Sequence, residues 1–531
     1  MVTQGTSGRL TALAEQAALT HLHSPVAVMF ETYAKKILNA RVYDVARQTP
    51  LESMPRLSAR LANRVLIKRE DLQPVFSFKL RGAYNMMVNL PPAVLSKGVV
   101  AASAGNHAQG VALAAARLGV PATIVMPVTT PSIKVAAVKA FGADAQLQGD
   151  GFDDAKAFAL ALCERSGCVF IPPFDHPDII AGQGTVGLEI LQDSGGAVDA
   201  IFVPVGGGGL IAGVAAMVKY LQPQIRVIGV EPDDAPTLHH ALAARSRVTL
   251  ETVGLFADGV AVRQIGEETF RVAREVVDEV VLVSGDEICA AIRDIFEDKR
   301  IVAEPAGALS LAGLKHYVAR TRCADQALVA IASGANIGFE RLAYVAERAS
   351  FGEQTEALFA VTVPERPGSF REFCQAIGRR PITEFNYRYC DATEAQVFAG
   401  VALHKGDRER QALRSRLLDK GYSVEDLTDN EMAKLHLRHM VGGRARQVAD
   451  ERLYSFEFPE RPGALLNFLT RMAVGWNISL FHYRNQGGDF GRVLVGLQVP
   501  TTDHVRFAAF LEGLGYRYCE QTDNIAYRLF L

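Results

Sequence analysis

This sequence has almost no excess of charge of either sign, and that scarcity excludes whole classes of partner. Lysine and arginine together number 56 and aspartate and glutamate 58, which gives a formal net charge of -2. A chain without a basic surplus has no bulk attraction to nucleic acid or to anionic membranes. We therefore expect small molecules as ligands, and neither a nucleic-acid nor a membrane partner.

Cysteine motifs and a leader segment are also missing. The seven cysteines form no CxxC motif and follow no regular spacing, which is typical of reduced thiols in a cytoplasmic protein and not of a zinc or other metal site. The first residues lack a basic head before an apolar run, so we expect no secretory signal. Residues 200–218 are uncharged, but Pro204 and the glycines 206–209 interrupt them, which favours a strand, a loop and a helix over a membrane span.

The chain has 531 residues, of which 49% are hydrophobic and 21% charged, and this size and composition predict several globular domains. From about residue 50 to 345, short apolar runs alternate with longer amphipathic stretches, a pattern that predicts an α/β body with a parallel sheet. Expected strands are 99–102, 122–126, 201–205 and 328–332, and expected helices are 107–118, 131–141 and 210–221.

The remainder of the chain repeats itself. The run Pro-Glu-Arg-Pro-Gly occurs at 364–368 and again at 459–463, and the segment 383–388 is echoed at 479–484. Each copy has the pattern strand, helix, strand, strand, helix, strand, which predicts an α+β fold of the ferredoxin-like, split βαβ type. In the first copy the expected elements are strands 358–363, 382–390 and 395–404 and helices 369–378 and 408–420.

Lys79 is the first candidate for chemistry. Ser77 is a good N-cap, which places Lys79 in the first turn of a helix that we expect to run to about residue 90. The helix dipole disfavours a cation there, and Phe78 and Leu80 would help to desolvate the amine. Both effects lower the pKa of an amine, as a Schiff-base lysine requires. A solvated helix lysine is the alternative interpretation.

Three further motifs each follow an apolar strand. Residues 103–107, Ser-Ala-Gly-Asn-His, offer backbone N–H groups for an anion such as a carboxylate, and Asn106 can donate to a phenolate-like oxygen. Residues 206–210, four glycines and a leucine, suit a monophosphate but fit neither GxGxxG nor the nucleoside-triphosphate loop. Ser333, in Ser-Gly-Ala-Asn, can meet a ring nitrogen. The alternatives are an Asn-capped turn, close strand–helix packing and a plain N-cap.

Together these groups meet the needs of pyridoxal phosphate, and the motifs resemble one known family. The chain is similar to the biosynthetic threonine dehydratases (threonine ammonia-lyases), pyridoxal-phosphate enzymes of the tryptophan-synthase-β fold type with two C-terminal ACT-like domains. The resemblance covers roughly residues 30–531. It is carried by the segments 68–74, 77–83, 103–110, 206–210, 303–308 and 333–336.

The resemblance implies a role for each site residue. It makes Lys79 the lysine that carries the cofactor, places Asn106 at the cofactor's 3' oxygen, and places Ser333 at its pyridine nitrogen. The phosphate would be held by Gly206, Gly207, Gly208, Gly209 and Leu210, and the substrate carboxylate by N–H groups around Ser103, Ala104, Gly105 and His107.

The implied reaction is the loss of water and then ammonia from L-threonine, with L-serine as a second substrate, to give 2-oxobutanoate in the first step of isoleucine biosynthesis. The family also implies a cytoplasmic homotetramer, inhibition by isoleucine and an opposing action of valine. Because aromatic residues alternate along the expected strands and an arginine follows, we take Tyr387, Tyr483, Arg388 and Arg484 as candidate effector contacts.

The expected domains are a two-lobed catalytic domain over 21–350, a regulatory domain over 357–429, a connector over 430–451 and a second regulatory domain over 452–531; residues 1–20 are assigned nothing. Two other functions stay open. One is a related pyridoxal-phosphate enzyme, namely a serine dehydratase, a serine racemase or a β-replacement synthase. The other is an amino-acid sensor without catalysis.

Overall fold

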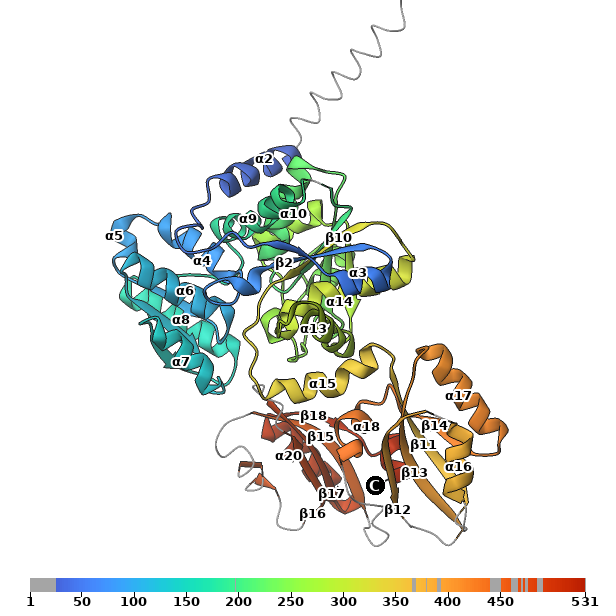
Figure 1. Ribbon diagram of the computed structural model, residues 1–531. Helices are drawn as coiled ribbons and strands as arrows, with labels where there is room; N and C mark the ends of the chain where they lie inside the picture. Colours follow the sequence, from blue (N-terminus) through green and yellow to red (C-terminus); the bar gives the residue numbers. More distant parts are fainter. Residues whose placement is uncertain are drawn as a thin grey trace, which may run out of the picture. The chain divides into compact units, whose positions relative to one another are not determined.

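The computed structural model describes residues 25–530 except 196, 365–368, 379, 389–392, 440–449, 460–466, 469–470, 473–475 and 485–489. The chain divides into two compact units, Met1–Ile337 and Gly338–Leu531, which are coloured blue to yellow and yellow to red in Figure 1. The catalytic boundary expected at residue 350 differs from this division by one helix, because α15 (Arg341–Gly352) belongs to the second unit.

The first unit alternates strands with helices, as the apolar runs predicted. Its strands are β1 (Leu51–Ser53), β2 (Arg64–Arg69), β3 (Val99–Ala102), β4 (Ala122–Met126), β5 (Asp144–Leu147), β6 (Val169–Phe170), β7 (Ala200–Pro204), β8 (Arg226–Pro232), β9 (Glu279–Val283) and β10 (Ala327–Ala332). Its helices are α2 (Pro25–Leu38), α3 (Pro55–Leu61), α4 (Lys79–Val88), α5 (Pro92–Leu95), α6 (Asn106–Leu118), α7 (Ser132–Ala140), α8 (Phe152–Ser166), α9 (Pro177–Ser194), α10 (Gly209–Leu221), α11 (Thr237–Ala244), α12 (Glu267–Val276), α13 (Gly285–Lys299) and α14 (Pro305–Thr321), with short 3-10 turns at Glu70–Leu72 and Asp258–Val260.

Two sheets form the two lobes of this unit. One has six strands in the order β1-β2-β10-β7-β8-β9, parallel except for β1, and the other has four parallel strands in the order β5-β4-β3-β6. The predicted parallel α/β body with two lobes is therefore confirmed. Within the described residues, no helix has both the length and the apolar run needed to cross a membrane.

Helix α4 joins the lobes because it packs against α6 of one and α9 of the other. The contact with α9 is very close, since a Cβ atom on Gly182 would lie 2.6 Å from the Cα atom of Gly82. Only glycine at both positions allows such an approach. Lys79 is the first residue of α4, so this contact helps to fix the position of the Lys79 backbone.

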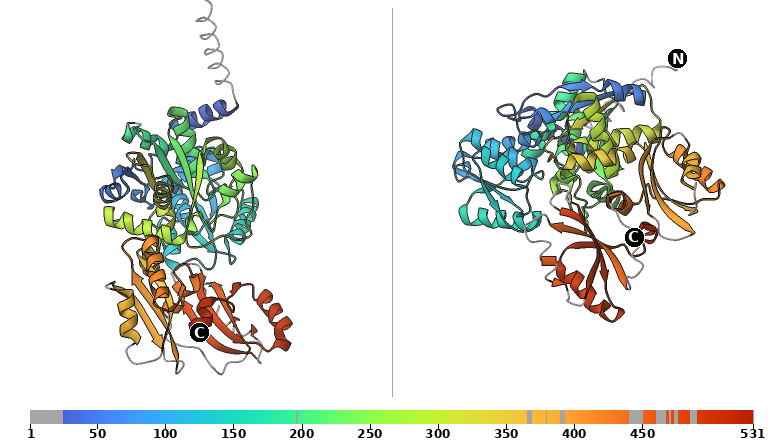
Figure 2. Two further views of the ribbon diagram at one scale, coloured as in Figure 1. Left: turned by 90° about the vertical axis from the view of Figure 1, so that its right-hand side faces the viewer. Right: turned by 60° about the horizontal axis from the view of Figure 1, so that its bottom comes forward.

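The second unit holds two similar antiparallel sheets. Each has four strands, in the orders β12-β13-β11-β14 and β16-β17-β15-β18, and the two sheets are coloured orange and red in Figure 2. The central position of β13 between β11 and β12 is the split βαβ arrangement that the repeat predicted. The elements after α15 are β11 (Glu356–Pro364), α16 (Ser369–Ile377), β12 (Ile382–Arg388), β13 (Glu394–Ala402), α17 (Asp407–Asp419), β14 (Ser423–Asp426), α18 (Glu431–Leu435), a 3-10 turn (Leu437–His439), β15 (Glu451–Pro459), β16 (Asn477–Arg484), β17 (Phe490–Gln498), a 3-10 turn (Thr501–Asp503), α20 (His504–Leu514), β18 (Arg517–Glu520) and α21 (Ile525–Phe530).

The repeat extends to irregular details of the backbone. The pairing of β12 with β13 shifts register between Ile382 and Glu384, and that of β16 with β17 shifts between Ile478 and Leu480. At each shift a hydroxyl donates to a carboxylate on the first strand of the sheet, Thr383 to Glu356 at the start of β11 and Ser479 to Glu451 at the start of β15. The duplication seen in the sequence is thus also a duplication of structure.

Candidate functional site

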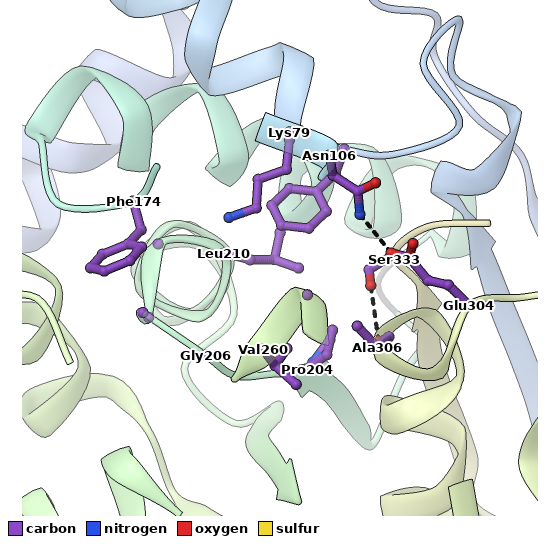
Figure 3. A pocket seen from close by; sticks show the side chains of 15 residues that line it. Lys79, Asn106, Phe174, Pro204, Gly206, Leu210, Val260, Glu304, Ala306 and Ser333 are labelled. Atoms are coloured by element: carbon purple, nitrogen blue, oxygen red, sulfur yellow. Dashed lines mark hydrogen bonds between the residues drawn. The ribbon is translucent and has the colours of Figure 1, made fainter. Parts of the chain in front are cut away.

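One pocket of the first unit brings together groups from segments that are far apart in the sequence. Lys79, Asn106, the glycines 206–209 and Ser333 all line it, and Figure 3 shows the side chains among them converging from different elements. The space is about 430 Å³, including the part that opens to solvent. The three motifs that follow strands lie at the carboxyl ends of β3, β7 and β10, where open α/β sheets bind ligands.

Lys79 begins α4, and its backbone N–H donates to the Ser77 hydroxyl at 3.3 Å. The N-cap position is therefore held by Phe78 and not by Ser77 as predicted, although the Ser77 hydroxyl still accepts from the first turn. The side chain is half-buried and donates from Nζ to the carbonyl of Pro173 at 3.1 Å. Burial lowers the pKa of the amine to about 8, against the opposing negative charge of Glu304. About one Lys79 amine in ten is therefore neutral at pH 7, far more than for an ordinary lysine.

Asn106 begins α6 and has its amide orientation fixed by two partners. Its Nδ2 donates to Glu304 Oε1 at 2.6 Å, and its Oδ1 accepts from Asn336 Nδ2 at 2.7 Å. Because an amide nitrogen has two hydrogens, this arrangement leaves one N–H of Asn106 for a ligand. Asn336 is itself fixed, since it donates to the carbonyl of Val75 at 2.8 Å.

Glu304 is a charged residue of this pocket to which the sequence analysis gave no role. It caps α14, and only 4% of its surface is exposed. Burial raises the pKa of its carboxyl to about 7. Gly334 lies against it, because a Cβ atom there would be 2.3 Å from Glu304 Oε1. The motif at residues 303–308 was a possible signal for Glu304, but nothing in it indicates that this carboxyl is buried and has a raised pKa.

The glycine loop connects β7 to α10 and is pressed against an aromatic ring. A Cβ atom on Gly207 would lie 2.1 Å from Cδ1 of Phe174, and one on Gly206 would lie 2.8 Å from Cα of Val260. Gly208 has a φ of +89°, which favours glycine. Packing therefore explains part of the glycine content. The loop nevertheless ends at the N-terminus of α10, where unpaired N–H groups and the helix dipole attract anions.

Ser333 follows β10, and 3% of its surface is exposed. Its hydroxyl donates to the carbonyl of Ala306 at 3.2 Å. A hydroxyl hydrogen can rotate to another acceptor, so this long hydrogen bond leaves the group able to donate to a ligand in the pocket.

The residues around Asn106 in the 103–107 motif are placed differently from Asn106 itself. Ser103, Ala104, Gly105 and His107 do not line the pocket, although Asn106 does. The buried ring of His107 has its Nε2 2.9 Å from the carbonyl of Ile171, and burial lowers its pKa to about 3. The ring is therefore a neutral donor to that carbonyl. A contact of residues 103–107 with a substrate carboxylate stays a prediction that depends on their backbone N–H groups.

Comparisons with known proteins agree with this geometry. The model of the family described as "Pyridoxal-phosphate dependent enzyme" matches residues 42–334, and "C-terminal regulatory domain of Threonine dehydratase" matches residues 347–437 and 442–531. The biosynthetic L-threonine dehydratase IlvA of Burkholderia multivorans is 56% identical over 94% of this chain and 99% of its own, and that of Escherichia coli is 55% identical over 94% and 97%. The chain belongs to the biosynthetic threonine dehydratases.

A solved structure supports the same assignment for the first unit. The processed form of threonine deaminase isoform 2 from Solanum lycopersicum has a TM-score of 0.60 and 50% identity, and it covers 61% of this chain and 94% of its own. Enzymes of this family depend on pyridoxal phosphate, so its cofactor should complement the pocket.

The residues of the pocket fit this cofactor. A partly neutral amine suits an aldehyde, the free N–H of Asn106 suits a ring oxygen, and the start of α10 suits a phosphate. Ser333 supplies an uncharged hydroxyl for a ring nitrogen. These groups line one pocket, and Figure 3 shows Lys79, Asn106 and Ser333 among its side chains.

The candidate effector residues lie at equivalent places in the two repeats. Tyr387 and Arg388 end β12, and Tyr483 and Arg484 end β16. The structure describes the backbone of these strands there, but these four side chains lie outside what it describes. The repeated Pro-Glu-Arg-Pro-Gly runs also lie outside the described residues, except for Pro364 and Pro459.

Proposed function

We propose that this chain converts L-threonine to 2-oxobutanoate and ammonia by β-elimination of water, with pyridoxal phosphate as cofactor. The observation that carries the proposal is the convergence of Lys79, Asn106, the glycine loop and Ser333 on one pocket. The family of the chain supports the choice of reaction.

Lys79 is the base of the proposed mechanism. Pyridoxal phosphate, when bound, supplies an electron sink that makes the α-hydrogen of an amino acid acidic. A neutral Lys79 amine can then accept that proton at Nζ, because burial keeps the pKa of the amine near neutral pH. The carbonyl of Pro173, which accepts from Nζ at 3.1 Å, holds the amine in place.

The other polar groups of the pocket would orient the ligand and match its charge. The pairing of Asn106 with Glu304 and Asn336 presents an N–H group, and not the amide oxygen, to the ring oxygen of the ligand. Ser333 donates a hydrogen bond without a charge, whereas an aspartate there would favour a protonated ring nitrogen and so transamination. The first N–H groups of α6 would hold the substrate carboxylate.

Purified protein that is given L-threonine should release 2-oxobutanoate and ammonia in equal amounts. L-serine should give pyruvate as a second product. If the protein instead yields D-serine, or joins a thiol to the substrate, the proposal is replaced by a racemase or a β-replacement synthase. If there is no turnover but threonine still binds, the chain is a sensor without catalysis.

We further infer that isoleucine inhibits the enzyme through the second unit, that valine opposes it, and that the enzyme is a cytoplasmic homotetramer. The regulatory-domain match to residues 347–437 and 442–531 supports the first part, and domains at 357–429 and 452–531 would be the two sensors. A chain that ends at Ile337, the last residue of the first unit, should keep activity and lose its response to isoleucine. Inhibition by isoleucine that is retained in this shortened chain would place the effector site in the first unit. Analytical ultracentrifugation of the full chain tests the tetramer.

A further inference from the structure

Two cysteines lie side by side where α8 ends and β6 begins. Cys163 is in the last turn of α8, and Cys168 comes directly before Val169, the first residue of β6. Their sulfur atoms are 3.4 Å apart, with the thiol of Cys168 donating to Cys163 Sγ. Both residues are unbonded and partly buried. The sequence gave no sign of this pair, since the two residues do not form a CxxC motif.

The two thiols have different surroundings. Burial raises the pKa of the Cys163 thiol to about 12, so this sulfur stays protonated. The hydroxyl of Ser166 lies 2.8 Å from the carbonyl of Leu162 and 3.0 Å from Cys168 Sγ, so its one hydrogen is shared between two acceptors. Because Cys163 is held as a thiol, we expect Cys168 to react first with an oxidant.

We propose that Cys163 and Cys168 form a reversible oxidation site that closes to a disulfide when the enzyme meets a mild peroxide. The Cys168 thiolate attacks hydrogen peroxide, the O–O bond breaks, and the products are a sulfenic acid and hydroxide. The Cys163 sulfur then attacks the sulfenic sulfur and loses its proton, and water leaves as the S–S bond forms. The two sulfurs supply the two electrons that reduce the peroxide, and a dithiol returns them.

The positions of the two cysteines favour formation of the disulfide. The sulfur atoms must approach from 3.4 Å to a bond length of about 2.05 Å, and the residues between them form a short turn. The N–H of Gly167 donates to the carbonyl of Cys163 at 2.8 Å, and Gly167 has a φ of +70°. This turn already brings the two ends together, so a disulfide needs only small side-chain movements.

The site stands at the start of a segment that leads to the catalytic pocket. Residues 169–170 pair with β3, the carbonyl of Ile171 faces the ring of His107, and the carbonyl of Pro173 accepts from Lys79. Cys168 is thus five residues before Pro173, whose carbonyl accepts from Lys79.

Peptide mapping tests the site on the full-length enzyme with its cofactor. Trypsin cuts after Arg165, so a disulfide would join the peptides 157–165 and 166–219. After a small excess of peroxide and alkylation of the free thiols, we expect this joined species, lighter by the two hydrogens lost, and its separation by dithiothreitol. Alkylation of both cysteines after peroxide, or their oxidation to sulfinic acids without a link, would overturn the proposal.

Single variants test the order of the two steps. In Cys163→Ser, a sulfenic acid on Cys168 should persist and react with dimedone, whereas in Cys168→Ser the remaining Cys163 should not be labelled. Cys163→Ala serves as a second variant, because this side chain packs among apolar residues such as Ala159 and Phe170. Cys323→Ser is the matched control, since Cys323 is also partly buried, and it should still form the link. Labelling of Cys163 in place of Cys168 would contradict the assignment.

Discussion

Lys68 and Lys79 lie eleven residues apart, and the structure gives their amines opposite surroundings. Lys68, on β2, is wholly buried, with its Nζ 2.8 Å from Glu189 and 3.3 Å from Asp193. Lys79, on the next helix, donates to the backbone carbonyl of Pro173. Carboxylates balance the charge of Lys68, whereas the partner of Lys79 is the dipole of a backbone carbonyl. Burial therefore makes a charge on Lys79 unfavourable. Partners, not burial, decide whether a lysine serves structure or chemistry.

The carboxylate beside Lys68 belongs to a larger network. Glu189 also pairs with Arg81 at 2.6 Å, and Arg81 pairs with Glu70 at 2.8 Å. All four of these side chains are wholly buried. Arg81 lies on α4, two residues after Lys79, so this network anchors the helix that begins with Lys79. Lys68 thus helps to position Lys79, the proposed base.

The largest expected effect comes from removing the reactive amine. Lys79→Ala should lower turnover of L-threonine by about 10⁴-fold, or about 5 kcal/mol in transition-state free energy, because a positioned base is lost. The absorbance of the covalently held cofactor should also disappear. Stopped-flow and absorbance measurements check both results. An active Lys79→Ala enzyme would remove Lys79 from the mechanism.

Removing the structural lysine should act on stability. Lys68→Met leaves three buried charges with a net negative charge, which should lower the free energy of unfolding by about 3–5 kcal/mol. Lys36→Met is the control, because Lys36 pairs with Asp178 near the surface, and its loss should cost less than about 1 kcal/mol. Urea unfolding of both proteins measures the difference. Equal losses would mean that burial of the Lys68 pair does not matter.

Much of the fold was predictable, because apolar runs and glycine-ended strands are local signals. The strand expected at 99–102 is β3, and the helix expected at 210–221 begins one residue earlier as α10. The repeat also predicted the second unit, since β13 was expected to lie between the other strands of a split βαβ fold. Such signals survive because each depends on side chains that are close in the sequence.

The site was predictable only where its residues begin helices or follow strands. Lys79, Asn106 and Ser333 meet these conditions and line the pocket, whereas Glu304 was given no role. Its pKa depends on burial against Gly334, a contact between residues thirty positions apart in the sequence. The contrast between Lys68 and Lys79 was also hidden, since partners such as Glu189 come from distant segments.

Replacement of Lys79 by an apolar residue should change stability in the opposite direction from replacement of Lys68. In the protein without cofactor, the ordinary lysine pKa of 10.5 falls to about 8 at Lys79 on folding, so the unfolded chain binds more protons between these values and stability rises with pH there. Below pH 8 the Lys79 amine is charged in the folded protein, and this charge lowers the free energy of unfolding. Lys79→Met should therefore stabilise the protein at pH 7 by about 1–3 kcal/mol, less than the full shift implies because the side chain is partly exposed.

The gain should shrink as pH rises from 8 and should vanish near 10.5, the ordinary lysine value. Urea unfolding of Lys79→Met and the unchanged protein across this range measures the gap. Lys68→Met should be destabilised under the same conditions, so the two lysine-to-methionine changes should have opposite signs at pH 7. A destabilised Lys79→Met protein would show that Lys79 has a compensating partner.

The smallest effect should come from the carboxylate across the pocket. Glu304 favours the charged form of Lys79, so Glu304→Gln should lower the pKa of the amine below its value of about 8. A neutral amine captures the cofactor's aldehyde. The rate at which the cofactor-free protein takes up pyridoxal phosphate should therefore rise at pH 7, by less than about ten-fold, the ratio for one pKa unit.

The pH dependence of this uptake separates charge from packing. Its midpoint should lie near 8 in the unchanged protein and at lower pH in Glu304→Gln. Glu231→Gln is the matched control, because Glu231 is also wholly buried with its pKa raised to about 7, yet it binds the start of α11 through the N–H groups of Leu238 and His239. Its midpoint should not move. If both variants shift the midpoint equally, the change reflects general loosening of the fold, and the charge of Glu304 does not tune Lys79.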